Sequence, residues 1–258
     1  MNLELYGKVV LITGGTDGLG LALAKRLTDE GAAVAVCGRD EDRVRAAEAE
    51  LREEDGDALA VRADVTRPED LQAFVDAAEA RWGRIDGVVH NAGRASAGAI
   101  ESVDDATWDA DFQLKLMAAV RLTRLTLPNL RETQGSILFT LALAAKAPGA
   151  SSEPSSVTRA AGMALMKALS KELAPHGVRS NAVLIGLIES GQWVRAAQAT
   201  GQTVDQFYEN FSKNAAIPLG RFGRALEFAD LGCFLLSPRA SYLTGVAINL
   251  DGGLSPVV

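Results

Sequence analysis

A glycine-rich loop between a short apolar run and a helical stretch is the clearest chemical feature of the sequence. Its residues are Thr13-Gly14-Gly15-Thr16-Asp17-Gly18-Leu19-Gly20. The first spaced glycine permits a tight turn, the second lets the backbone approach a pyrophosphate, and the third lets the helix pack closely on the strand. Free amides at the start of the helix then face the phosphates. The loop predicts a dinucleotide site, and a glycine-rich turn without a ligand is the alternative.

The end of the second apolar run indicates which nicotinamide dinucleotide fits. An acidic residue about 20 positions after the loop would hold the ribose 2′-hydroxyl of NAD. Here Gly38 stands at that position and Arg39 follows it, and a guanidinium favours a 2′-phosphate. Asp17 argues the other way, because a carboxylate in the glycine loop would repel that phosphate. We predict NADP as the cofactor, with NAD as the alternative.

Lys115 is the strongest candidate for a group that transfers a proton. A lysine on a mostly buried helix can have its pKa lowered toward neutrality and act as an acid or base. The alternative is a lysine whose stem covers apolar surface while its ammonium reaches solvent. His90 can titrate near neutral pH, but we expect a hydrogen-bonded structural imidazole. We expect Tyr208 to shape a pocket, and the alternative is that it swings over the site.

The elements that position these groups alternate between apolar runs and longer helical stretches. Runs that are apolar throughout, separated by helices, predict a parallel sheet covered on both faces. The predicted fold class is α/β: one Rossmann-type domain over 1–258, a doubly wound parallel sheet that binds ligands at the carboxyl ends of its strands. The predicted strands are 8–13, 33–37, 58–61, 85–90, 136–141, 178–184 and 246–249. The predicted helices are 19–30, 41–53, 68–81, 106–130, 154–173 and 225–236.

The stretch 186–217 breaks this rhythm, and we predict that it forms helical pieces that cover the site as a lid. It is apolar and aromatic, with Arg195 and Lys213 as candidate anion contacts. These residues indicate a small-molecule substrate of hydrophobic or mixed character.

Composition limits the possible partners. The net charge is −7 and no basic run is present, which argues against nucleic acid or an anionic membrane surface as the main partner. Cys37 and Cys233 lie in apolar runs, and we expect both to be small core residues without a disulfide or metal. No apolar run reaches membrane-spanning length, and we expect a cytoplasmic protein.

Several further motifs, in the right order, resemble those of the short-chain dehydrogenase/reductase (SDR) family over roughly 6–254. Asp64-Val65 resembles the pair that contacts the adenine, and His90-Asn91-Ala92-Gly93 resembles an Asn-Asn-Ala-Gly stretch with its first asparagine replaced. Two further stretches and the end of the chain resemble the C-terminal signature of the family: Ile217-Pro218-Leu219-Gly220-Arg221, Tyr242-Leu243-Thr244-Gly245 and Asp251-Gly252-Gly253. The resemblance also implies that Gly186 and Ile188 contact the cofactor, and that the protein is a homodimer or homotetramer through helices 106–130 and 154–173.

The resemblance implies a catalytic tetrad, and all four of its positions are changed here. In the family a tyrosine exchanges the proton at the substrate oxygen, and a lysine four residues later lowers its pKa. A serine thirteen residues before the tyrosine binds the substrate oxygen, and an asparagine completes a proton relay. The matching positions are Ser155, Arg159, Ala142 and Lys115 respectively. No tyrosine lies between Tyr6 and Tyr208.

The altered site leaves three functions open. Ser155 alone is too weak an acid to replace a phenol, whereas Arg159 stays charged and can bind ribose hydroxyls. The first function is an NADP-dependent oxidoreductase, acting on a carbonyl or alcohol, whose proton donor has moved to another residue. The second is a non-redox lyase, isomerase or cyclase on the same scaffold. The third is a non-catalytic dinucleotide-binding sensor or partner subunit.

Overall fold

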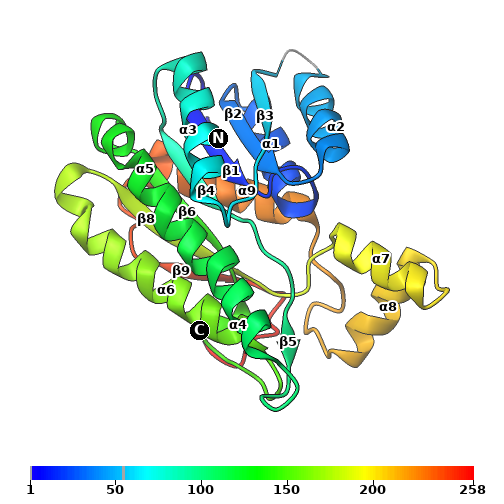
Figure 1. Ribbon diagram of the computed structural model, residues 1–258. Helices are drawn as coiled ribbons and strands as arrows, with labels where there is room; N and C mark the ends of the chain where they lie inside the picture. The colour runs from blue at the N-terminus through cyan, green and yellow to red at the C-terminus, as the bar shows by residue number, and fades with distance from the viewer. Residues whose placement is uncertain (1, 54–55) are drawn as a thin grey trace.

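A parallel sheet of seven strands forms the centre of the computed structural model, which describes residues 2–53 and 56–258 (Figure 1). Its strands are β1 (Val9–Thr13), β2 (Ala33–Gly38), β3 (Ala58–Arg62), β4 (Gly87–His90), β6 (Ser136–Ala142), β8 (Arg179–Ile185) and β9 (Ala247–Leu250). They lie in the order β3-β2-β1-β4-β6-β8-β9. The winding reverses between β1 and β4, where a doubly wound sheet opens a crevice at the carboxyl ends of its strands. The predicted fold class is confirmed.

Helices cover both faces of the sheet, as the fully apolar strands require. Residues of α1 (Gly18–Asp29), α2 (Glu41–Arg52) and α9 (Ala225–Leu236) pack into the core on one face. Residues of α3 (Pro68–Trp82), α5 (Ala118–Thr133) and α6 (Ser155–Glu172) build the core on the other face. The two cores hold the sheet rigid, so that the loops at its carboxyl edge have fixed positions.

The helix predicted over 106–130 is not continuous, and this is a correction to the sequence-based expectation. It consists of α4 (Asp105–Phe112), a π-helical turn (Gln113–Met117) and α5. A π turn is rare and is found mostly at functional sites. It keeps the chain helical and contains neither Gly nor Pro, so the apolar pattern carries no sign of it. Lys115 lies at its centre.

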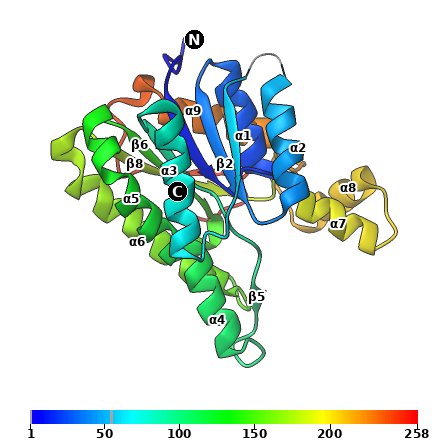
Figure 2. The same ribbon diagram turned by 45° about the horizontal axis from the view of Figure 1, so that its top comes forward.

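The stretch 186–217 contains two short helices, α7 (Gly191–Ala199) and α8 (Val204–Asn214), which extend away from the sheet (Figures 1 and 2). They are held together by their own aromatic cluster, in which Trp193 lies 5.2 Å from Phe211 and 5.6 Å from Phe222 between ring centroids. Tyr208 packs on Phe222 at 4.7 Å. The rings therefore form a local core that is separate from the two cores of the sheet.

Cys37 and Cys233 are both free and buried. Burial raises the pKa of each thiol to about 12, so neither forms a reactive thiolate near neutral pH. Across residues 2–53 and 56–258, no helix is both long and apolar enough to cross a membrane.

Candidate cofactor site and active site

A cleft of about 830 Å³ lies along the carboxyl edge of the sheet. With one exception, every residue predicted to bind the cofactor lines it: Gly14, Thr16, Asp17, Gly18, Leu19, Arg39, Asp64, Val65, Asn91, Ala92, Gly93, Arg159, Gly186 and Ile188. The exception is Gly20, which is buried beneath the loop. Lys115, Ser155 and Ala142 line the same cleft, so the residues predicted for cofactor binding and those predicted for chemistry share one continuous space.

The glycine loop has the shape that a pyrophosphate needs. Gly18 has a φ of +55° and faces open space, since an added Cβ would approach only the Ser190 Cβ, at 3.7 Å. A Cβ on Gly20 would collide with the carbonyl oxygen of Gly14. Asp17 precedes α1 but its side chain does not cap the helix, which leaves the first-turn amides free to bind an anion.

Asn91 holds the glycine loop in place. Its side-chain amide donates hydrogen bonds to the carbonyl oxygens of Thr13 (3.1 Å) and Gly14 (3.0 Å). In turn, the Thr13 hydroxyl accepts from the backbone amides of Asn91 and Ala92, each at 3.1 Å. Since the Asn91 amide is used within the protein, its contribution to a cofactor is the position of the loop.

Arginines gather at the adenosine end of the cleft. Arg39 and Arg43 both line it, and Arg43 was missed in the sequence. Asp17, which argued against a 2′-phosphate, lies 3.4 Å from an Arg43 nitrogen and 3.8 Å from an Arg195 nitrogen. Two guanidinium groups thus offset its charge. The position of Arg43 was the available signal, because α2 begins at Glu41, only two residues after Arg39, and Arg43 lies in its first turn.

Two other titratable candidates have structural surroundings. The His90 ring is buried, and its Nε2 lies 2.9 Å from the Thr123 hydroxyl. Burial lowers the pKa of His90 to about 3, in agreement with the expected neutral, structural imidazole. Tyr208 does not line the cleft, whereas Trp193 does. Lys213 pairs with Glu209 at 2.7 Å on the exposed side of α8, away from the cleft.

Lys115 is sealed inside the site, so the alternative of an ammonium that reaches solvent is wrong. Only 1% of its side chain is exposed. Its Nζ donates to the Ser155 hydroxyl at 2.7 Å and forms an ion pair with Asp111 at 2.6 Å. Burial lowers the pKa of Lys115 to about 8, and the charges of Arg159 and Arg94 act in the same direction, whereas the adjacent Asp111 carboxylate opposes the shift. A lysine with this pKa exchanges protons efficiently near neutral pH.

Ser155 lies at the first turn of α6, between Lys115 and the open cleft. Its oxygen accepts from the Lys115 ammonium and from the backbone amide of Ser96 at 3.0 Å. The backbone amide of Ser155 donates to the Ser96 carbonyl at 3.2 Å, which ties the two segments together. With both contacts made by donors to its oxygen, the hydroxyl hydrogen of Ser155 is left for a group in the cleft.

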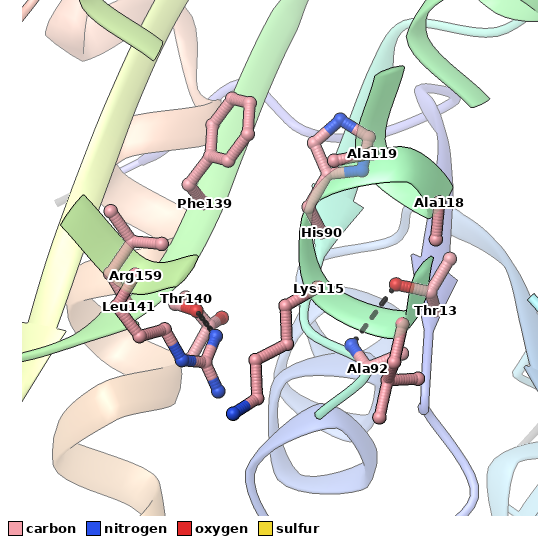
Figure 3. Close-up of a pocket in the computed structure, with 11 residues that line it drawn as sticks. Thr13, His90, Ala92, Lys115, Ala118, Ala119, Phe139, Thr140, Leu141 and Arg159 are labelled. Carbon is pink, nitrogen blue, oxygen red and sulfur yellow. Dashed lines mark hydrogen bonds between the residues drawn. The ribbon is translucent and has the colours of Figure 1, made fainter. Parts of the chain in front are cut away.

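Arg159 reaches the inner end of the cleft from the next turn of α6. Its Nη1 donates to the Thr140 carbonyl at 2.6 Å, and its side chain extends toward the same region as that of Lys115 (Figure 3). Burial lowers the pKa of Arg159 to about 10, so the group stays charged at neutral pH. The guanidinium lies against Gly93, where an added Cβ would come within 2.6 Å of Nη2.

Asp111 and Thr158 are functional candidates that the sequence reasoning missed. Asp111 is 1% exposed and is the penultimate residue of α4, before the π turn, and its Oδ2 accepts the Thr158 hydroxyl at 2.7 Å. The only signal for Asp111 was its position four residues before Lys115. Thr158 gave none, because its role depends on how two helices pack.

Similarity to known proteins identifies the family of the chain. A family model for enoyl-(acyl carrier protein) reductase matches residues 14–255. L-fucose dehydrogenase of Oryctolagus cuniculus is 34% identical over 96% of this chain and 84% of its own. The chain belongs to the short-chain dehydrogenase/reductase family. The suspected resemblance to SDR proteins is therefore confirmed.

Two solved SDR structures are close to this chain throughout their length. One is an NADPH-bound short-chain oxidoreductase from Pseudomonas aeruginosa PAO1 that contains an atypical catalytic centre. It is 37% identical in sequence to this chain and has a TM-score of 0.92. The match covers 97% of this chain and 98% of that structure. The other is L-sorbose reductase from Gluconobacter frateurii with NADPH and L-sorbose, 32% identical, with a TM-score of 0.95 and full coverage of both chains. At the level of the family, the prediction of NADP as cofactor is confirmed.

Proposed function

We propose that this SDR protein is an NADP(H)-dependent oxidoreductase that reduces a carbonyl group through a Ser155–Lys115 proton relay. The observation that carries the proposal is the 2.7 Å hydrogen bond from the buried Lys115 ammonium to the Ser155 hydroxyl at the edge of the cleft. It links an acid with a pKa of about 8, Lys115, to Ser155, which stands at the position where the family has a phenol. The loss of the tetrad is thereby compensated.

The cofactor fits the residues present. The free amides of α1 would hold its pyrophosphate, Arg39 and Arg43 its 2′-phosphate, and Arg159 its nicotinamide ribose. When bound, NADPH supplies a hydride to the carbonyl carbon of the substrate. Arg159 has one N–H committed to Thr140, and its other donors are available to ribose hydroxyls.

The protein residues supply the proton. The Ser155 hydroxyl donates its hydrogen to the carbonyl oxygen, and the Lys115 ammonium passes a proton to the Ser155 oxygen as that hydrogen leaves. Carbonyl carbon and oxygen thus gain a hydride and a proton, and Lys115 ends neutral. Ser155 need not be a strong acid here, because it only transmits the proton.

The substrate is proposed to be a small carbonyl compound of mixed polarity. Its end of the cleft is lined by Ala97, Ala144, Ser152, Gln192 and Trp193, with apolar and hydrogen-bonding groups side by side. The names of the similar proteins add L-sorbose and L-fucose as probes. We propose that α7 and α8 act as the predicted lid, since Trp193 and Arg195 already line the cleft.

The test measures NADPH binding by calorimetry and then NADPH oxidation with a panel of ketoses and ketoesters. Lys115→Met and Ser155→Ala are expected to lower kcat by about 100-fold or more while NADPH still binds, since general acid catalysis contributes about 10² to 10⁴. Lys171→Met and Ser241→Ala are matched controls, because both residues are exposed and outside the cleft. Unchanged turnover in Lys115→Met would contradict the proposed proton relay. NADPH binding without turnover on any substrate would favour the sensor alternative.

A homodimer or homotetramer formed through α5 and α6 is also proposed, on the resemblance to the family. Sedimentation analysis of the purified protein distinguishes these states from a monomer. A cytoplasmic location likewise stays a prediction.

A further inference from the structure

A buried chain of four side chains joins α4, the π turn and α6. It runs from the Thr158 hydroxyl to Asp111 (2.7 Å), from Asp111 to the Lys115 ammonium (2.6 Å), and from Lys115 to Ser155 (2.7 Å). The proposed relay uses only its last two members. Asp111 and Thr158 do not line the cleft, and neither exchanges a proton with the substrate in the proposed relay.

We infer that Asp111, fixed by Thr158, is a positioning residue that keeps the Lys115 ammonium charged and directed at Ser155. This inference rests on the proposed function, in which Lys115 must carry a proton to act as the acid in carbonyl reduction. It does not follow from the tetrad of the family, which has an asparagine and a tyrosine at the positions of Lys115 and Ser155.

Burial is the first argument. The Asp111 and Lys115 side chains are 0% and 1% exposed. A buried charge is unfavourable unless it is paired and hydrogen-bonded. Oδ2 of Asp111 accepts a hydrogen bond from Thr158, whereas Oδ1 has no hydrogen-bond partner and is held by its ion pair with Lys115 alone. The carboxylate is therefore fixed in orientation, and a fixed carboxylate determines where the ammonium lies.

The charges around Lys115 are the second argument. Arg159 on α6 and Arg94 after β4 both disfavour its ammonium form, and Asp111 on α4 favours it. His90, which faces the same small cavity from β4, is buried and neutral. Among these groups Asp111 is the single negative charge. Without it, two arginines and burial would remove the proton that the relay needs.

The spacing on α6 is the third argument. Ser155 and Thr158 are three residues apart and lie on the same face of the helix. The same face of α6 therefore carries both hydroxyl groups. The Ser155 hydroxyl receives a proton from Lys115, and the Thr158 hydroxyl holds Asp111, the ion-pair partner of Lys115. The ammonium donates one of its three protons to Ser155, while Asp111 stabilises its charge through the ion pair.

The experiment measures the Lys115 titration directly as well as turnover. The chain has seven lysines, at positions 8, 25, 115, 146, 167, 171 and 213, so NMR of lysine labelled at Cε gives few signals, and Lys115→Met assigns one. In the wild type we expect this signal to titrate near pH 8, with the kcat for reduction falling as pH rises through the same midpoint. Asp111→Asn keeps the shape but removes the charge. Both midpoints should then move to lower pH by about one unit or more.

Asp86→Asn is the matched control. Asp86 is also a buried carboxylate, paired with Lys8 and Arg84, but it precedes β4 at the far edge of the sheet from the cleft. This variant should lose stability without moving the Lys115 midpoint. Thr158→Val should lower kcat about fivefold, the value of one hydrogen bond, without a change in KM, and Thr158→Ser should restore it.

The outcomes separate the inference from the proposed function. An unmoved Lys115 signal in Asp111→Asn overturns the inference, whether or not the wild type turns over any substrate. A shifted titration midpoint for Lys115 with an unchanged pH dependence of kcat also overturns the inference, because Asp111 then has no effect on catalysis. A protein without turnover contradicts the proposed function, and the NMR titration still decides the role of Asp111. If Asp111→Asn fails to fold, an unchanged kcat profile in Thr158→Val overturns the inference.

Discussion

The effect of the Asp17 charge on cofactor binding depends on the residues that surround it. Taken alone, a carboxylate in the glycine loop disfavours a 2′-phosphate. In the structure it lies between Arg43 and Arg195, so its charge is offset and Arg39 is left to face the cleft. The arginines, rather than Asp17, are therefore expected to decide between NADP and NAD.

Replacing Arg39 and Arg43 together by serine should weaken NADPH binding by about tenfold or more, since charge-assisted hydrogen bonds contribute about 1.5 to 3 kcal/mol. NADH binding should change little, because NADH lacks the 2′-phosphate. Calorimetric titration with each cofactor measures both. Arg45→Ser is the control, because Arg45 is on α2 but pairs with Asp42 away from the cleft. Equal loss of NADPH and NADH affinity would contradict the assignment.

At the scale of elements, the start of α1 has more features of an anion site than its three glycines alone. The first turn of the helix holds no acidic residue, and no side chain caps its amides. Gly18 has left-handed backbone and faces the open cleft. The space left there is the space that a pyrophosphate would fill.

Gly18→Ala should therefore lower NADPH affinity about tenfold, because its methyl group would occupy that space and strain the loop. Gly83→Ala is a matched control, since Gly83 also has a positive φ (+67°) and open surroundings, but ends α3 away from the cleft. Both variants should lose about 1 to 2 kcal/mol of stability from left-handed backbone strain, measured by denaturant unfolding. Similar NADPH affinity in the two variants would show that the loop does not hold the phosphates.

The elements also show what the sequence predicts well and what it does not. Fully apolar runs such as 33–37 predict parallel strands, because only a sheet covered on both faces needs them. The glycine loop lines the cleft, and its assignment to a dinucleotide stays a prediction from the glycine spacing. The π turn at 113–117 could not be predicted, since it leaves the apolar pattern intact. The link from Thr158 to Asp111 spans 47 positions and exists only because α4 and α6 pack together.

At the scale of the whole molecule, the cleft touches the ends of β1, β4 and β6 together with α1, α6 and α7. A cofactor bound there would contact both halves of the doubly wound sheet. Binding to the folded state alone stabilises a protein by mass action. The cofactor is thus expected to stabilise the whole fold.

NADPH at 100 times its Kd should raise the melting temperature by roughly 5 to 10 °C, from about 2.7 kcal/mol of linkage and about 2 to 4 °C per kcal/mol for a chain of this size. Differential scanning calorimetry measures the shift. Gly18→Ala should show a smaller shift at the same NADPH concentration. A melting temperature that does not respond to NADPH would mean that the cleft is not a dinucleotide site.

The two cysteines have a practical consequence of their own. Both thiols lie within the core with a pKa of about 12, so thiol reagents have no native target on the folded protein. A cysteine introduced at Thr200, between α7 and α8, and another at Lys171 on α6 would be the only sites to accept a spin label or fluorophore. Distances between such labels would follow the opening of α7 and α8 in the unaltered background of this chain.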